Sequence, residues 1–277
     1  MGALKESRVA VITGGAGGLG RVMAWALVEG GHRVVAMDNN AGLLEAMRGE
    51  FRDAVADGAL HTVQGDVQVE ADCNRAVAEG VERLGAMHMV INNAGWGPSN
   101  LRDDAERNQP TIEELTPEIW QKYIGINVMG AIQMTRAALP HMRAAGWGRI
   151  INNTTTFRTM LRIQPYGGVK AMLESITAVW AQELAGTGIN VYVLAPGGPT
   201  DTAFVSDNSG WPREKMLRPQ IMAAPVRWLV SPNSDGENAR RITAAMWPIE
   251  APPGERVDDA ITDIGWPMLS AQAIYPT

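Results

Sequence analysis

The sequence predicts an α/β fold: a Rossmann-like, doubly wound parallel sheet with three α/β/α layers in a single domain. Short apolar runs rich in β-forming residues alternate with longer amphipathic stretches, which is typical of βαβ units. The alternation continues through almost all 277 residues, with no internal repeat or low-complexity linker that would divide the chain. A composition of 45% hydrophobic and 19% charged residues is typical of a globular chain and argues against long disorder.

The expected elements follow one another in a regular order. Short runs of apolar and β-branched residues predict strands at Arg8–Thr13, Arg33–Met37, Leu60–Gln64, Met87–Asn92, Arg149–Asn153, Asn190–Leu194 and Ile242–Met246. Helical apolar spacing predicts helices at Leu19–Gly30, Ala41–Ala56, Glu70–Leu84, Trp120–Ala144 and Tyr166–Gly186.

Two segments do not follow this alternation. Residues 96–117 are polar and contain three prolines, so we expect a long inserted loop between a strand and a helix. Residues 248–277 contain five of the sixteen prolines and have no clear period, which predicts an irregular C-terminal arm.

Composition also excludes several classes of function. A single cysteine, Cys73, excludes a disulfide framework and a cysteine-based metal cage, and no two histidines form an H-x-x-x-H pair, so we expect no metal site. The net charge of −6 argues against a nucleic-acid surface. The chain has neither an apolar run of 18 residues nor a signal-peptide pattern, which predicts a soluble cytoplasmic protein with no membrane partner.

A glycine-rich loop directly follows the first expected strand and precedes a helix. Its glycines, Gly14, Gly18 and Gly20, have the spacing G-x-x-x-G-x-G. Glycines allow the backbone to approach a phosphate group, whose negative charge the N-terminus of the following helix favours. Asp38 ends the second expected strand, 24 residues after Gly14. A carboxylate at that place accepts hydrogen bonds from a ribose 2′-hydroxyl and repels a 2′-phosphate.

Tyr166 and Lys170 are four residues apart, so they share one face of an expected helix. A phenol with an ordinary pKa of about 10 is a poor acid or base at neutral pH. A nearby ammonium group stabilises the phenolate and makes the tyrosine a usable general acid or base.

With these motifs, almost the whole chain resembles the short-chain dehydrogenase/reductase family. The family's cofactor loop, T-G-x-x-x-G-x-G, matches Thr13–Gly20, and its Asn-Asn-Ala-Gly turn matches Asn92–Gly95. The resemblance implies that the cofactor-binding residues are Gly14, Gly18, Leu19, Gly20, Asp38, Asp66, Val67, Asn93, Ala94, Gly95, Tyr166, Lys170, Pro196, Gly197 and Thr202. It implies that the catalytic residues are Asn127, Thr155, Tyr166 and Lys170.

The chain departs from the family pattern at two positions. Where the family has a serine after the fifth strand, this chain has Thr154, Thr155 and Thr156. Counting from the strand favours Thr155, whereas counting back 12 residues from Tyr166 gives Thr154; we prefer Thr155, since a threonine hydroxyl has the same donor and acceptor capacity as serine. The Pro-Gly motif is one residue longer than its commonest form, so Thr200 and Thr202 are alternatives for the nicotinamide contact, and we prefer Thr202.

The resemblance implies an NAD(H)-dependent oxidoreductase, an alcohol dehydrogenase or ketoreductase that interconverts a secondary alcohol and a ketone. Asp38, with no basic neighbour, favours NAD(H). An NADP(H)-dependent carbonyl reductase and a non-catalytic dinucleotide-binding regulator are the alternatives. Trp96 and Trp211 flank the expected substrate side and favour a hydrophobic or aromatic substrate, although core packing explains them equally well.

Members of the family usually form dimers or tetramers through the two long helices around the fifth strand, here Trp120–Ala144 and Tyr166–Gly186. The second helix has more apolar residues than one buried stripe requires: Ala171, Met172, Ile176, Val179, Trp180 and Leu184. We therefore expect a homodimer or homotetramer, with a small-molecule substrate as the other partner.

Overall fold

The computed structural model describes residues 7–266, which form one α/β domain around an eight-stranded sheet. The strand order is β3-β2-β1-β4-β5-β6-β7-β8, and all neighbours are parallel except β7 and β8. The strands are β1 (Val9–Thr13), β2 (Arg33–Asp38), β3 (Leu60–Gln64), β4 (Met89–Asn92), β5 (Gly148–Asn153), β6 (Ile189–Ala195), β7 (Arg240–Thr243) and β8 (Ile261–Asp263). The strand order reverses between β1 and β4, which is where such sheets bind ligands.

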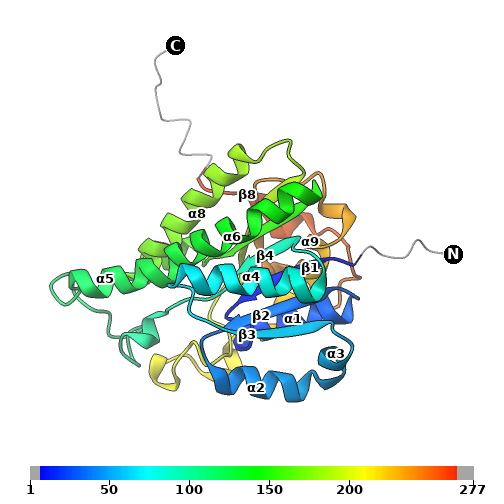
Figure 1. Ribbon diagram of the computed structural model, residues 1–277. Helices are drawn as coiled ribbons and strands as arrows, with labels where there is room; N and C mark the ends of the chain where they lie inside the picture. Colours follow the sequence, from blue (N-terminus) through cyan, green and yellow to red (C-terminus); the bar gives the residue numbers. More distant parts are fainter. Residues whose placement is uncertain (1–6, 267–277) are drawn as a thin grey trace, which may run out of the picture.

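Helices cover both faces of the sheet (Figure 1). They are α1 (Gly18–Glu29), α2 (Ala41–Glu50), α3 (Arg52–Ala56), α4 (Glu70–Leu84), α5 (Pro117–Ile124), α6 (Gly130–Ala145), α7 (Phe157–Met160), α8 (Tyr166–Glu183) and α9 (Ala223–Leu229). None of the helices in residues 7–266 is both long and apolar enough to span a membrane.

Strand β1 shows why a central strand of this sheet is almost entirely apolar. All five of its residues are buried, because side chains on both faces of the strand enter a core. Ala10 and Ile12 pack in the core that contains residues of α1 and α9, whereas Val9 and Val11 pack with residues of α4 and α6. This arrangement confirms the three-layer prediction.

Several expected boundaries were wrong. The helix expected at Ala41–Ala56 is two helices that meet at Phe51, whose side chain is buried in the core. The helix expected at Trp120–Ala144 consists of α5, a π-helical turn at Gly125–Met129, and α6. The strand expected at Ile242–Met246 is β7, which ends at Thr243 and is followed by a 3-10 turn.

The two segments outside the alternation have little regular structure in the described residues. Residues 96–117 contain one short 3-10 turn at Pro98–Asn100, and α5 begins at Pro117. The arm is not wholly irregular, because β8 extends the sheet and pairs antiparallel with β7. The last part of the expected arm, residues 267–277, lies outside the described residues.

Candidate active site

A cavity of about 900 Å³ lies at the carboxyl ends of the central strands. The glycine loop after β1 and Asp38 at the end of β2 line one end of the cavity. Thr155 after β5 and Tyr166 at the start of α8 line the other end, together with parts of the inserted segment 96–117. The fold therefore places the glycine loop and the Tyr-x-x-x-Lys motif in the lining of one cavity.

The glycine loop makes a tight turn at the cavity that side chains other than glycine would not fit. Gly14 and Gly18 have positive φ angles of 60° and 41°, which favour glycine. A Cβ on Gly20 would lie 2.1 Å from the carbonyl oxygen of Gly14, so a side chain there would displace the loop. Helix α1 begins at Gly18, and its N-terminal end lies at the cavity. Gly20 itself does not line the cavity; it packs beneath the loop.

Asp38 lies at the end of the cavity that the glycine loop lines. Its carboxylate accepts hydrogen bonds from the backbone N–H groups of Ala16, at 3.3 Å, and Asn40, at 3.0 Å. These bonds hold the carboxylate beside the loop, where a bound ribose would lie. The remaining residues expected at the cofactor and found in the cavity lining are Leu19, Asp66, Val67, Asn93, Ala94, Gly95, Pro196 and Gly197.

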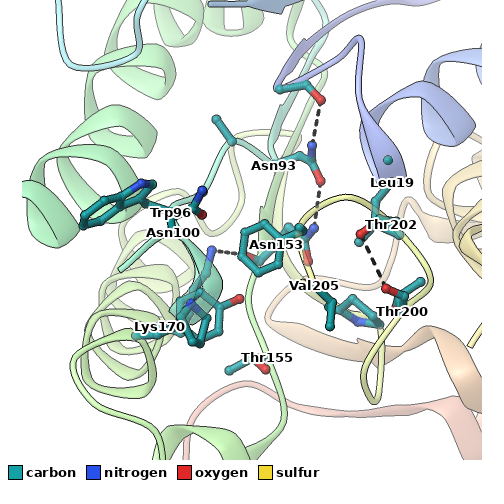
Figure 2. A pocket seen from close by; sticks show the side chains of 18 of the residues that line it. Leu19, Asn93, Trp96, Asn100, Asn153, Thr155, Lys170, Thr200, Thr202 and Val205 are labelled. Atoms are coloured by element: carbon teal, nitrogen blue, oxygen red, sulfur yellow. Dashed lines mark hydrogen bonds between the residues drawn. The ribbon is translucent and has the colours of Figure 1, made fainter. Parts of the chain in front are cut away.

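A chain of hydrogen bonds crosses the base of the cavity and joins β1, β4, β5 and α8 (Figure 2). The side-chain amide of Asn93 donates to the carbonyl of Thr13 at 3.0 Å, and that of Asn153 donates to Asn93 Oδ1 at 2.9 Å. Lys170 Nζ donates to the carbonyl of Asn153 at 2.9 Å. The glycine loop and the lysine are therefore held in one rigid frame. Asn153 Oδ1 is buried and accepts no hydrogen bond from the described residues.

Asn127 lies in the π-helical turn, where the regular helical hydrogen bonding is interrupted. Its side-chain amide donates to the carbonyls of Tyr123, at 3.0 Å, and Trp96, at 3.2 Å, and its Oδ1 accepts from the Trp96 N–H at 3.3 Å. Asn127 is only 1% exposed and does not line the cavity. It lies behind Gly95, where an added Cβ would be 3.0 Å from Asn127 Oδ1 and 3.6 Å from Lys170 Nζ.

Tyr166 and Lys170 both line the cavity and are buried. Lys170 Nζ lies 5.7 Å from the centre of the Tyr166 ring. Burial, together with the charges of Glu106 and Tyr123, raises the pKa of Tyr166 above its ordinary value. Burial lowers the pKa of Lys170 to about 8, so the ammonium form predominates at neutral pH.

The three threonines after β5 have different surroundings. The Thr154 hydroxyl is buried and donates to Glu174 Oε2 at 3.2 Å. Thr156 caps α7, where its hydroxyl accepts the Thr159 N–H at 3.2 Å. The Thr155 hydroxyl has no hydrogen-bond partner within residues 7–266, and Thr155 lines the cavity below Lys170 in Figure 2. Of the three hydroxyls, that of Thr155 is the one available to a ligand.

Thr200 and Thr202 also differ in their surroundings, although both line the cavity (Figure 2). Thr200 is 5% exposed and pairs in an isolated β-bridge with Leu217. Thr202 lies directly against the glycine loop, since a Cβ on Gly18 would be 3.1 Å from Thr202 Cγ2. This contact places Thr202 beside the glycine loop.

Two segments far apart in the sequence meet beside the cavity, and the sequence alone did not indicate this contact. Figure 1 shows the inserted segment, in teal, beside the yellow segment that follows β6. Arg107 donates to the carbonyl of Asn208 at 2.6 Å, and Trp211 Nε1 donates to Glu106 Oε2 at 2.6 Å. Ser99 Oγ accepts the backbone N–H of Ser206 at 3.0 Å. We call these two segments, residues 99–107 and 206–211, the clasp.

Glu106 is the residue of this site that the sequence reasoning missed. The inserted segment contains several acidic residues, and nothing in its polar, aperiodic pattern distinguishes the one that lines the cavity. Trp96 and Trp211, which the sequence placed on the substrate side, both line the cavity.

Comparisons with known proteins identify the family of the chain. The family model for short chain dehydrogenases matches residues 8–212. A 2-(R)-hydroxypropyl-CoM dehydrogenase from Xanthobacter autotrophicus is 33% identical over 194 residues, covering 69% of this chain and 74% of that protein. A putative ketoacyl reductase of granaticin polyketide synthesis from Streptomyces violaceoruber is 37% identical over 147 residues, so this chain spans only 54% of its length. The crystal structure of a 3-ketoacyl-(acyl-carrier-protein) reductase from Brucella melitensis, complexed with NADH, superposes with a TM-score of 0.72 at 28% identity, covering 85% of this chain and 95% of that one.

Proposed function

The chain belongs to the short-chain dehydrogenase family, and from this premise we propose that it is an NAD(H)-dependent oxidoreductase that interconverts a secondary alcohol and a ketone. The observation that carries the proposal is the arrangement of Thr155, Tyr166 and Lys170 around one cavity with the glycine loop. Relatives named as a dehydrogenase and as a ketoacyl reductase support the same reaction class.

The cavity fits a nicotinamide dinucleotide. Helix α1 begins at Gly18 of the glycine loop, so the backbone N–H groups of its first turn would be available to the diphosphate, and Asp38 would accept hydrogen bonds from the ribose hydroxyls. Asp66 and Val67 would contact the adenine, and Thr202 would bind the nicotinamide amide. Bound there, the cofactor would accept or donate the hydride.

The protein groups would control the proton. In alcohol oxidation the Tyr166 phenolate would take the proton of the substrate hydroxyl, and in ketone reduction the phenol would return it. The positive charge of Lys170 would favour the phenolate and so offset the effect of burial. The free Thr155 hydroxyl would donate a hydrogen bond to the substrate oxygen and orient it towards Tyr166.

Asn127 would act from behind the cavity. Its hydrogen bonds fix the backbone of Trp96, and Gly95 separates it from Lys170. In that place it would help to hold the water through which the proton of Tyr166 and Lys170 exchanges with solvent.

The preference for NAD(H) over NADP(H) rests on Asp38. A carboxylate bound by two backbone N–H groups stays at the position that a 2′-phosphate would occupy, and like charges there repel. The NADH complex of the Brucella reductase is consistent with this preference.

We also propose that the protein forms a homodimer or homotetramer through α5, α6 and α8. Leu184, directly after α8, is buried within the subunit, whereas Met172 and Val179 of α8 are 44% and 58% exposed. These two side chains give the helix an apolar outer face that a symmetric copy would cover.

One experiment tests the proposed reaction. The purified protein is incubated at alkaline pH with NAD⁺ or NADP⁺ and a panel of secondary alcohols, and the absorbance of the reduced cofactor is followed. We expect turnover with at least one alcohol and a higher initial rate with NAD⁺. Binding of NADH without turnover of any alcohol or ketone would contradict catalysis, and a higher rate with NADP⁺ would contradict the cofactor assignment.

A further inference from the structure

A carboxylate lies in the half of the cavity that would hold the substrate. Glu106 belongs to the inserted segment, and its side chain lines the cavity together with Gln109, Thr155 and Tyr166. Burial raises the pKa of Glu106, and the negative charge of Glu106 in turn raises the pKa of Tyr166. Glu106 and Tyr166 therefore line the same cavity, close enough for the charge of one to affect the other.

The carboxylate is held in place from across the cavity. Trp211 Nε1 donates to Glu106 Oε2 at 2.6 Å, and the next residue, Arg107, fixes the loop through the carbonyl of Asn208. The other carboxylate oxygen, Oε1, has no hydrogen-bond partner within the described part of the chain. Glu106 Oε1 is thus free to accept a hydrogen bond, and the contacts between the two segments of the clasp fix its position.

Such an acceptor discriminates strongly between substrates. A bound apolar group would exclude water from Glu106 Oε1 and offer no donor in return, which costs the full desolvation of a charged atom. A donor group on the substrate would restore the hydrogen bond. Sites built to bind a hydroxyl reject analogues that lack it far more strongly than apolar pockets distinguish a methylene.

The neighbouring charges favour a neutral donor over an ammonium group. Arg158 and Arg162 line the same cavity, and neither guanidinium forms an ion pair with an acidic group of residues 7–266. Their positive charge would repel a cationic substrate. A hydroxyl group provides a donor without that repulsion.

We propose that Glu106 selects substrates with a second hydroxyl beside the reacting carbon, that is, vicinal diols and the corresponding hydroxyketones. Oε1 accepts the hydrogen bond of this second hydroxyl while Thr155 and Tyr166 engage the reacting oxygen. This inference rests on the proposed alcohol–ketone reaction and adds its substrate class.

The test compares two ligands that differ in one hydroxyl, trans-cyclohexane-1,2-diol and cyclohexanol. Their equilibrium binding is measured by tryptophan fluorescence, both to the protein saturated with NADH and to the protein alone. We expect the diol to bind about 10- to 100-fold more tightly than cyclohexanol, as a hydrogen bond to a charged group allows. In Glu106→Leu this ratio should fall to near one, with cyclohexanol binding unchanged or improved.

Three further variants test whether the diol preference depends on the Glu106 carboxylate and on its hydrogen bond to Trp211. Glu106→Gln keeps an acceptor and should retain part of the diol preference, and Trp211→Phe should reduce it because the carboxylate is no longer held. Glu113→Gln changes an exposed carboxylate of the same inserted segment and should leave the ratio unchanged.

Equal binding of the two ligands to the wild type, or a diol preference that survives Glu106→Leu, would overturn the inference. Tighter binding of trans-2-aminocyclohexanol than of the diol would overturn the choice of a hydroxyl. A failure to bind NADH contradicts the proposed function instead, and the ligand ratio measured on the protein alone still decides the role of Glu106.

Discussion

Lys170 donates its hydrogen bond to the backbone carbonyl of Asn153 and pairs with no carboxylate of the described residues. The ammonium is therefore buried against a neutral dipole, which explains why its pKa falls to about 8. The same bond fixes the start of α8 to the end of β5, so the position of the lysine depends on the strand that precedes Thr155.

This burial predicts a pH-dependent contribution to stability. Because the pKa of Lys170 is about 8 in the folded protein and about 10.4 when unfolded, the unfolded chain binds more protons between these values. The free energy of unfolding then rises with pH in this window. Relative to Lys170→Met, the wild type should gain about 2 kcal/mol between pH 7 and 9.5 in urea unfolding without cofactor. The control Lys215→Met, at an exposed lysine, should keep the wild-type profile.

Replacing Tyr166 with Phe should remove proton transfer and leave cofactor binding almost intact. General acid–base groups contribute about 10²- to 10⁴-fold, so kcat should fall by at least that factor. NADH titration should give a nearly unchanged Kd. Tyr192→Phe removes a buried hydroxyl that donates to the Ser234 carbonyl, away from the cavity lining, and should keep full activity. Wild-type turnover by Tyr166→Phe would show that another group carries the proton.

Asp38→Ala should shift cofactor preference towards NADP(H). The change removes both a charged acceptor for the ribose and the repulsion of a 2′-phosphate, so the ratio of kcat/KM for NAD⁺ to that for NADP⁺ should fall about 10- to 100-fold. Asp57→Ala, at an exposed position after α3, is the matched control. An unchanged ratio in Asp38→Ala would mean that Asp38 only stabilises the loop through Ala16 and Asn40.

Substitutions of two threonines after β5 should have different effects: at Thr155 on activity, and at Thr154 on stability. Thr155→Ala should lose about 10-fold or more in kcat with little change in stability, because its hydroxyl is free for the substrate, and Thr155→Ser should recover most of it. Thr154→Ala should cost about 1 to 3 kcal/mol of stability, because it removes the buried bond to Glu174. The reverse result would assign the substrate contact to Thr154.

The outer face of α8 should determine assembly. Light scattering should give a mass at least twice 29.8 kDa. Val179→Glu places a charge on the exposed apolar face and should lower that mass, whereas Val55→Glu, on the exposed side of α3, should not. A wild-type monomer mass would contradict the oligomer.

The strands and the glycine loop were predictable because their signals are local. Four consecutive apolar residues and a threonine, followed by glycines, indicate a buried strand and a tight turn without reference to the rest of the chain. The family motifs added Asp38, Tyr166 and Lys170, and the structure brings all three to one cavity.

The errors arose where distant contacts override the local pattern. Arg240 and Arg241 look too polar for a buried strand, and β7 was therefore expected two residues too late. Arg241 is nevertheless buried because Glu174 of α8 pairs with its charge, and no pattern within β7 reveals that partner. Glu106 was missed for a similar reason, since its role depends on Trp211, 105 residues away.

The clasp also has a kinetic consequence. The segments that meet through Arg107 and Trp211 contribute Glu106 and Trp211 to the lining of the cavity. A product that left the cavity between these two segments would have to separate them, and in many enzymes such opening is slower than the chemistry. Release of the ketone or alcohol would then limit kcat. An alcohol deuterated at the reacting carbon would therefore be oxidised with the same kcat as the undeuterated alcohol.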